Sequence, residues 1–208
     1  MALERLTSPS FEPVSLLEAR RWLRLEDADT ANTPVLNVLI KAVREEAENL
    51  THRAFVSRQY RLNLGAYPAD SWYGWRIELP FPPLISVDAF KYIDTDGVLQ
   101  TLSTTLYETH DEVEPAFIIP AYQQVWPATR SRPDGVQITF TAGYAPGSPS
   151  DEAANQDVLP ANLRLWMQSK LATMFEQREQ LMAGSMAKVP RDYADALLDP
   201  LIIGTRMF

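Results

Sequence analysis

The chain has 208 residues, of which 46% are hydrophobic and 22% charged, so it can bury the core of one domain or of one domain with a sizeable insertion. It contains no cysteine, which excludes a disulfide framework or a thiolate metal site and indicates a reducing compartment. The formal net charge of -8 argues against a protein that mainly grips nucleic-acid phosphates, because such binding needs clustered Lys and Arg.

The hydrophobic residues are spread along the chain rather than gathered into one long run. No stretch has the length of a signal peptide or the ~20 apolar residues of a membrane span. We therefore expect a protein made in the cytoplasm, with no membrane association. The chain has sixteen prolines but only eight glycines, which predicts stiffened rather than flexible turns.

Residues 1–56 have helical periodicity. Ser15 and Glu18 in SLLEARRWLRL match a capping box and predict a first helix. Thr33, followed by Pro34, predicts the start of a second helix that ends near His52. Its apolar stripe has 3.6-residue spacing and consists of Leu36, Leu39, Ile40, Val43, Ala47 and Leu50. The polar residues expected outside this stripe are Lys41, Arg44, Glu45 and Glu48.

Residues 57–145 change to the two-residue period of strands. QYRLNL, WRIEL and VQITFTAGY alternate apolar and polar residues, which predicts a small antiparallel sheet or partial barrel. AFKYIDTDGVLQTL predicts a hairpin whose turn is Asp94 to Gly97, with Gly97 supplying the positive φ. The remaining connections are rich in proline, and the step PFPP lies between two predicted strands.

Residues 146–208 return to helical periodicity after a polar linker. Pro160 predicts the start of a helix whose stripe contains Leu163, Trp166, Met167 and Leu171. We therefore predict an α+β fold: a small α-helical bundle, built from two N-terminal helices and the C-terminal helices, with an inserted antiparallel β module. The predicted domains are 1–56 with 146–208 for the bundle, and 57–145 for the module.

No set of residues predicts catalysis, a metal site or a cofactor site. The chain lacks G-x-S-x-G, G-x-x-x-x-G-K-[ST] and G-x-G-x-x-G. His110 lies in the acidic run ETHDEVE, so a hydrolase that uses Asp111, Glu112 or Glu114 with His110 is one alternative. A solvated acidic loop explains the same residues, because transition-metal sites usually need several His or Cys ligands.

The aromatic residues of the β region suggest a second alternative. Trp72 and Tyr73, in AYPADSWYGW, are expected in an exposed loop that contacts a neighbouring subunit or a tail component. Trp126 is expected to pack in the core of the sheet. If Trp126 is instead exposed, the three side chains could form a stacking platform of a carbohydrate- or protein-binding β module.

The order of several segments resembles the head-tail connector (adaptor) proteins of tailed double-stranded-DNA bacteriophages. The similar segments are PVSLLEARRWLRL, AENLTHRAF, SRQYRLNLGAYP, IELPFPPLISVDAFKYIDTDG, VWPATRSRPDGVQITFTAGYA and LPANLRLWMQSKLATMFEQRE. Together they span about residues 13–182 in the same order, including a proline-rich step between two strands and a strand that ends in F-x-A-G-Y. The C-terminal segment GSMAKVPRDYADALLDPLIIGTRMF is only loosely similar.

This resemblance implies a structural virion protein that is not an enzyme. It implies a homo-oligomeric ring, commonly of twelve copies, beneath the portal protein at the head-tail junction, with a tail or stopper protein docked below. DNA would pass through such a ring without specific binding, and the acidic chain suits this role because a basic lumen would hold DNA. The proline-rich step is then a braced connection in a part that must keep its shape.

The last eight residues, LIIGTRMF, are apolar apart from one arginine. We expect this tail to order on binding the portal protein. The residues predicted to bind the portal are Leu201, Ile202, Ile203, Arg206, Met207 and Phe208.

Overall fold

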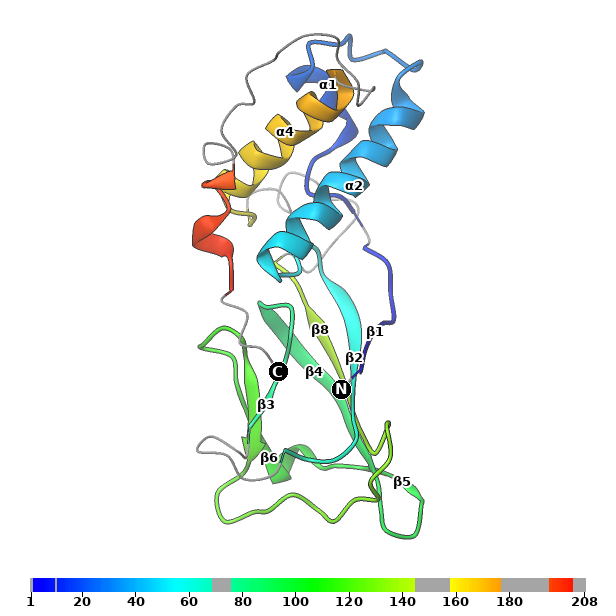
Figure 1. The fold of residues 1–208 in the computed structure, drawn as a ribbon, viewed down its shortest axis with the longest axis vertical. Coiled ribbons are helices and arrows are strands. Elements are labelled where there is room, and N and C mark those ends of the chain that lie inside the picture. Colours follow the sequence, from blue (N-terminus) through cyan, green and yellow to red (C-terminus); the bar gives the residue numbers. More distant parts are fainter. Residues whose placement is uncertain (1, 10, 69–75, 145–157, 177–194, 204–208) are drawn as a thin grey trace, which may run out of the picture. The chain divides into compact units, whose positions relative to one another are not determined.

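The computed structural model describes residues 2–9, 11–68, 76–144, 158–176 and 195–203. The chain divides into two compact units, which are treated separately below. Unit 1 contains residues 1–9 and 57–146, and unit 2 contains residues 10–56 and 147–208. Figure 1 shows the helices of unit 2 and the strands of unit 1. None of the described helices is both long enough and apolar enough to span a membrane.

Unit 2 contains the helices α1 (Leu16–Trp22), α2 (Thr33–Thr51) and α4 (Ala161–Glu176), and the 3₁₀ turn η2 (Asp199–Leu201). Ser15 caps α1 as predicted, because its Oγ accepts a hydrogen bond from the backbone N–H of Glu18 at 3.0 Å. The carboxylate of Glu18 does not complete the capping box. It accepts a hydrogen bond from Arg164 of α4 at 2.6 Å and thereby links α4 to α1.

Helix α2 begins and ends close to the predicted residues. Its N-cap residue is Asn32, one residue before the predicted Thr33. The predicted end near His52 is confirmed, since His52 adopts a left-handed conformation with φ 56°. The buried apolar residues of α2 and α4 form the core of this unit: Leu36, Ile40, Val43, Ala47, Leu163, Trp166, Met167 and Leu171.

The predicted exposed face of α2 is wrong at Arg44 and Glu48. Both residues are buried, with 3% and 2% of their surface exposed, whereas the predicted core residue Leu50 is exposed. Arg44 forms an ion pair with Glu48 at 3.1 Å and another with Glu12 at 2.7 Å. Burial opposes the charge of the Arg44 guanidinium, but its hydrogen bond to Glu12 and the nearby carboxylates outweigh this, so the pKa of Arg44 is raised. A buried charge is tolerated because it is paired.

Unit 1 contains two antiparallel sheets. The larger has the strand order β1-β2-β8-β4-β5, and the smaller has the order β3-β7-β6. The strands are β1 (Ala2–Arg5), β2 (Arg58–Leu64), β3 (Ile77–Glu78), β4 (Leu84–Ile93), β5 (Leu99–Thr101), β6 (Tyr107–His110), β7 (Phe117–Pro120) and β8 (Val136–Ala142). The predicted hairpin is confirmed between β4 and β5, where Gly97 has φ +87°.

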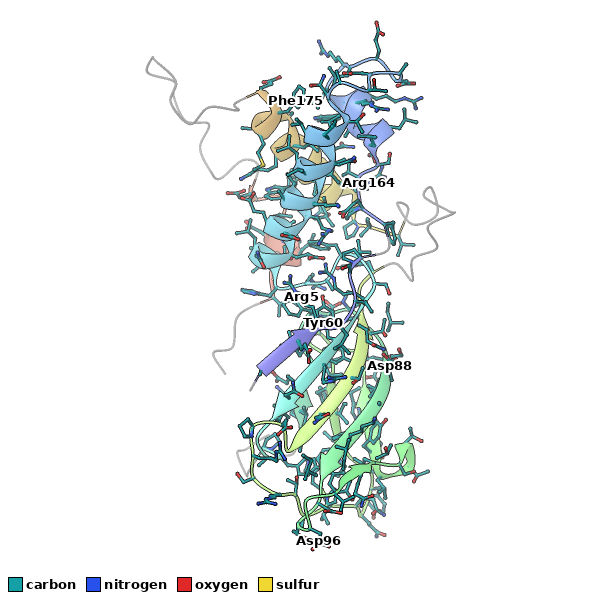
Figure 2. The ribbon with its side chains drawn as sticks, turned by 90° about the vertical axis from the view of Figure 1, so that its right-hand side faces the viewer. Arg5, Tyr60, Asp88, Asp96, Arg164 and Phe175 are labelled. Carbon is teal, nitrogen blue, oxygen red and sulfur yellow. The ribbon has the colours of Figure 1, made fainter. Side chains whose placement is uncertain are left out.

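Alternating side chains of the larger sheet are buried, as the two-residue period predicts. Tyr60 and Leu62 of β2 and Ile138 and Phe140 of β8 are all almost completely buried. On the opposite face of the sheet, Asp88 of β4 accepts hydrogen bonds from Gln59 of β2 and Thr141 of β8, at 2.9 and 2.7 Å (Figure 2). The larger sheet therefore has one apolar face and one polar face.

The predicted fold class, a small helical bundle with an inserted β module, is wrong. Its mixed α+β character stands, but the described residues contain three α-helices and eight strands in two antiparallel sheets. Residues 2–5 lie in the range assigned to the bundle, yet they form β1 and pair with β2 from Ala2↔Asn63 to Arg5↔Tyr60. The segment ALER has no strand periodicity of its own, so its conformation comes from pairing. The strands β6 and β7 likewise escape detection because each has only four residues, whereas β3 lies within the predicted strand WRIEL.

Candidate assembly surfaces

The C-terminal segment 195–203 is anchored to α4 and to the end of α2. The indole Nε1 of Trp166 donates to Asp195 at 3.1 Å, and Asn162 donates to the carbonyl of Leu197 at 2.7 Å. Arg53, directly after α2, donates from Nε to the carbonyl of Leu201 at 2.6 Å. These bonds hold residues up to Leu201 inside unit 2.

The predicted portal-binding residues therefore differ in their burial. Leu201 is only 8% exposed and contributes to the core of unit 2. Ile202 is exposed, and the backbone N–H of Ile203 donates to the carbonyl of Thr51 at 3.2 Å. Arg206, Met207 and Phe208 lie outside the described residues. The end of α2 thus fixes the position of Ile203, the last residue that the structure describes.

A second candidate surface is the loop between β7 and β8. Tyr122 and Val125 are the two most exposed large hydrophobic side chains among the described residues, with 84% and 83% of their surface accessible. We call residues 122–125 the tip patch. Sequence reasoning assigned no role to these residues. The available signal was an aromatic and a Val separated only by glutamines, between Pro120 and Pro127.

Trp126 lies beside the tip patch but does not form an exposed platform. Its ring stacks on Tyr67 with centroids 5.0 Å apart and planes 3° apart, and it also contacts Phe90 at 5.5 Å. Phe90 in turn contacts Tyr107 of the smaller sheet at 5.3 Å. The surrounding apolar groups also bury the Tyr67 hydroxyl, and this burial, followed by the nearby Tyr92, raises the pKa of Tyr67. Trp126 is thus half-buried against Tyr67 and Phe90, between the core position expected for it and a fully exposed platform. The other proposed platform residues, Trp72 and Tyr73, lie outside the described residues.

The acidic run around His110 places the carboxylates of Glu108 and Glu112 near the ring. The His110 ring stacks on Phe117 with centroids 4.8 Å apart. Its nitrogens lie 3.9 Å from Glu108 and 3.8 Å from Glu112, which is beyond hydrogen-bonding distance. Asp111 and Glu114 are exposed. Within the part of the chain that the structure describes, no group of three or more His, Cys, Asp or Glu residues is arranged to hold a metal ion.

Comparison with known proteins identifies the fold. No protein-family model matches the sequence, and no curated protein matches it by sequence. Similar solved structures include the neck of an empty GTA particle computed with C6 symmetry, the virion of a native gene transfer agent (GTA) particle, and the neck of a native GTA particle computed with C12 symmetry. Their TM-scores are 0.73, 0.71 and 0.63. Each match has 24% identity and covers 99% of this chain and 100% of the other.

The chain therefore shares its fold with chains of GTA particles. Because the match covers both chains almost completely, it includes the helical unit and the sheet unit together. At 24% identity this likeness establishes the fold.

Proposed function

We propose that this chain is a structural subunit of a virion neck, where it forms a homo-oligomeric ring at the head-tail junction. The observation that supports this function is the full-length similarity to neck structures computed with C6 and C12 symmetry. Both symmetries are compatible with a ring of twelve copies. A ring uses two different surfaces of each subunit, and rotation about one axis closes it.

In this proposal the ring is an adaptor that lies beneath the portal protein and receives a tail or stopper protein below. DNA passes through the ring without specific binding, and the net charge of -8 supports this because phosphate binding requires basic clusters. The ring needs no cofactor and catalyses no reaction. Its function is to remain rigid while it joins the portal protein to the tail or stopper protein.

The C-terminal tail is the proposed contact with the portal protein. Ile202 is exposed and Ile203 is tethered to Thr51, so the described residues next to the tail have a fixed position in unit 2. A deletion of residues 201–208 would also remove the buried Leu201 and disturb unit 2. The sharper test deletes residues 204–208 alone and should abolish portal association without changing the melting temperature.

The function itself is tested by disrupting the gene in a phage or prophage that carries it. We expect electron microscopy to show filled or empty heads and separate tails, and we expect the gene supplied in trans to restore joined particles. Mass spectrometry of purified wild-type particles should also detect this chain. Normal infectious particles from the disrupted strain would refute the neck function.

The alternative of a carbohydrate- or protein-binding β module has weaker support. It requires Trp126 in an exposed platform, whereas this ring packs on Tyr67 and Phe90. A ligand-induced change in tryptophan fluorescence of the isolated chain would favour this alternative.

A further inference from the structure

The larger sheet of unit 1 has two strand edges without a partner strand among the described residues. One is the outer side of β1, which pairs only with β2, and the other is the outer side of β4 over residues 84–89. We propose that β1 of one copy pairs with β4 of the next copy, so that the larger sheets of the ring join into one antiparallel sheet. This inference rests on the proposed neck function and names one of its subunit contacts.

The short strand β5 covers only one end of β4. It pairs with residues 91–93, and the backbone N–H of Leu102 donates to the carbonyl of Phe90 at 2.8 Å. Within the part of the chain that the structure describes, no backbone hydrogen bond reaches the outer side of residues 84–89. Ser86 and Asp88 in this segment are exposed. This part of β4 can therefore accept a further strand.

Strand β1 also directs unused backbone groups outward. The N–H of Leu6 donates to the carbonyl of Gln59 at 2.9 Å, so the backbone groups of Leu6 face β2. Because the residues of an antiparallel strand alternate in direction, those of Glu4 also face β2, whereas the N–H and C=O groups of Leu3 and Arg5 point away from it. A row of such groups is a template for pairing with another strand.

The directions of the two edge strands are complementary. Consecutive strands from β1 through β2 and β8 to β4 are antiparallel, so β1 and β4 run in opposite directions. Figure 2 shows them at opposite sides of the sheet, with Arg5 labelled near β1 and Asp88 labelled near β4. Neighbouring copies in a ring of twelve differ by a small rotation, which leaves strand directions almost unchanged. Strand β4 of one copy and β1 of the next therefore meet as an antiparallel pair.

This geometry favours a second copy over a different protein as the partner. A ring has heterologous contacts, in which one surface of a subunit meets a different surface of the next. Each copy supplies one edge of each kind, so pairing around a closed ring leaves no free edge, whereas another partner would have to cover two unlike edges. Neither β1 nor residues 84–89 contain the lysine or proline that often protects an exposed edge.

The irregularity of β4 suits a curved assembly. Its register against β8 shifts twice, within residues 84–86 and within residues 87–89. Such bulges bend a strand and increase its twist, which curves a sheet. Because β1 has only four residues, this pairing buries too little surface to hold two copies together alone. We therefore expect it to act with other surfaces of the subunit and to set the register between neighbours.

The first experiment removes one outward N–H group and keeps the pairing of β1 with β2. Arg5→Pro eliminates the backbone N–H of residue 5 and places the proline ring on the outer side of β1, where an edge strand tolerates proline. Supplied to the gene-disrupted strain, this variant should lower the number of joined particles by at least about tenfold. Arg5→Ala is the matched control, because it removes the same side chain but keeps the N–H, and it should restore wild-type numbers.

Both purified variants should melt at the temperature of the wild-type chain, because the N–H of Arg5 points away from β2. Wild-type numbers of joined particles with Arg5→Pro would overturn the proposed pairing.

The second experiment identifies the partner directly. Ser86 donates to Asp88 at 2.7 Å on the polar face of the sheet, and Glu4 accepts from Arg61 on the same face at 3.4 Å. The chain has no cysteine, so Glu4→Cys with Ser86→Cys introduces the only two thiols. Within one chain, β1 and β4 are three strand spacings apart, roughly 14 Å. A bismaleimide shorter than this distance can therefore join the two thiols only between copies.

Purified particles of the double variant should give a ladder of multimers of this chain. Either single-cysteine variant should give no ladder. Glu4→Cys combined with Val113→Cys should also give none, because Val113 is 49% exposed in the same unit but belongs to neither edge.

The outcomes separate this contact from the function. Absence of the ladder from normally joined particles of the double variant would overturn the pairing and leave the neck function intact. A cross-link from Glu4→Cys to a different virion protein would show that this protein covers the edge of β1, and it would overturn the second copy as partner. Failure of the neck function itself appears earlier, as normal particles from the disrupted strain.

Discussion

The two units are held together in different ways. In unit 2, segments far apart in the sequence are joined by polar side chains: Glu12 with Arg44, Glu18 with Arg164, and Arg53 with the carbonyl of Leu201. In unit 1, distant segments are joined by backbone ladders, such as β2 with β8 over seven residue pairs, and by stacked aromatic rings. Both units bury an apolar core, so they differ in the interactions that align their distant segments.

The difference follows from the hydrogen bonding of the backbone. A helix satisfies its interior N–H and C=O groups within itself and has only side chains to offer a neighbour. A strand leaves these groups for the next strand, so pairing itself sets the register. The alignment of distant segments in unit 2 therefore depends on a few specific side chains, whereas in unit 1 it depends on the pairing and close packing of the backbone.

Replacement of the buried Arg44 should cause the largest loss of stability. Arg44→Ala leaves the buried Glu48 carboxylate without its ion pair, so the free energy of unfolding of unit 2 should fall by about 3 kcal/mol. Native-state hydrogen exchange of the α2 amides measures this change. Lys41→Ala, which removes a positive charge from the exposed face of α2, should cost less than about 0.5 kcal/mol. Equal effects of the two substitutions would contradict a role for the buried pair.

The next largest loss of stability is expected in unit 1, from a substitution at Gly135, where two backbone carbonyl groups approach closely. A Cβ at Gly135 would lie 2.7 Å from the carbonyl oxygen of Arg130 and 2.8 Å from that of Gly65, so Gly135→Ala must move backbone. We expect a loss of about 2 kcal/mol, seen as faster exchange in β8 and β2. Gly65→Ala is the control, since its Cβ would meet its nearest atom at an ordinary 3.6 Å. Faster exchange in α2 as well would show that the two units unfold together.

A weaker effect is expected where unit 2 relies on a single cap. Ser15→Ala removes the acceptor of the Glu18 N–H and should lower the stability of α1 by about 1 kcal/mol. Exchange of the first amides of α1 measures the loss. Ser15→Asp keeps an acceptor oxygen and should restore most of the protection; no difference between the two variants would exclude capping as the cause.

The smallest effect is a pH dependence at the hairpin of unit 1. The hydrogen bond from Gln100, followed by those from backbone N–H groups, lowers the pKa of Asp94. The ionised form is therefore favoured by folding, and its stabilisation is present above the unfolded pKa of about 3.9 and is lost as pH falls through the lower folded pKa. Wild type should melt above Asp94→Asn at neutral pH, and this gap should close in acid. Asp96→Asn, which removes a charge from the same turn but no acceptor of these bonds, should show a smaller gap.

The sequence alone determined the features that depend on near neighbours. The helices α2 and α4, the cap at Ser15, the hairpin turn at Gly97 and the alternating burial of β2 and β8 all follow from local periodicity, capping and turn chemistry. The order of these segments also resembles phage connector proteins, and the chain has the fold of a chain from a GTA particle.

Only the tertiary structure decided the features that depend on distant partners. Residues 2–5 become a strand because β2 offers an edge, and the charge of the buried Arg44 is paired by Glu12, which lies 32 residues away in the sequence. Leu201 is buried in unit 2, where Arg53 donates a hydrogen bond to its carbonyl, while Tyr122 and Val125 are exposed beside Trp126, which stacks on Tyr67. The type of a side chain limits the positions that it can occupy. Its burial and its partners also depend on which segments of the chain come into contact, and these segments are tens of residues apart in the sequence.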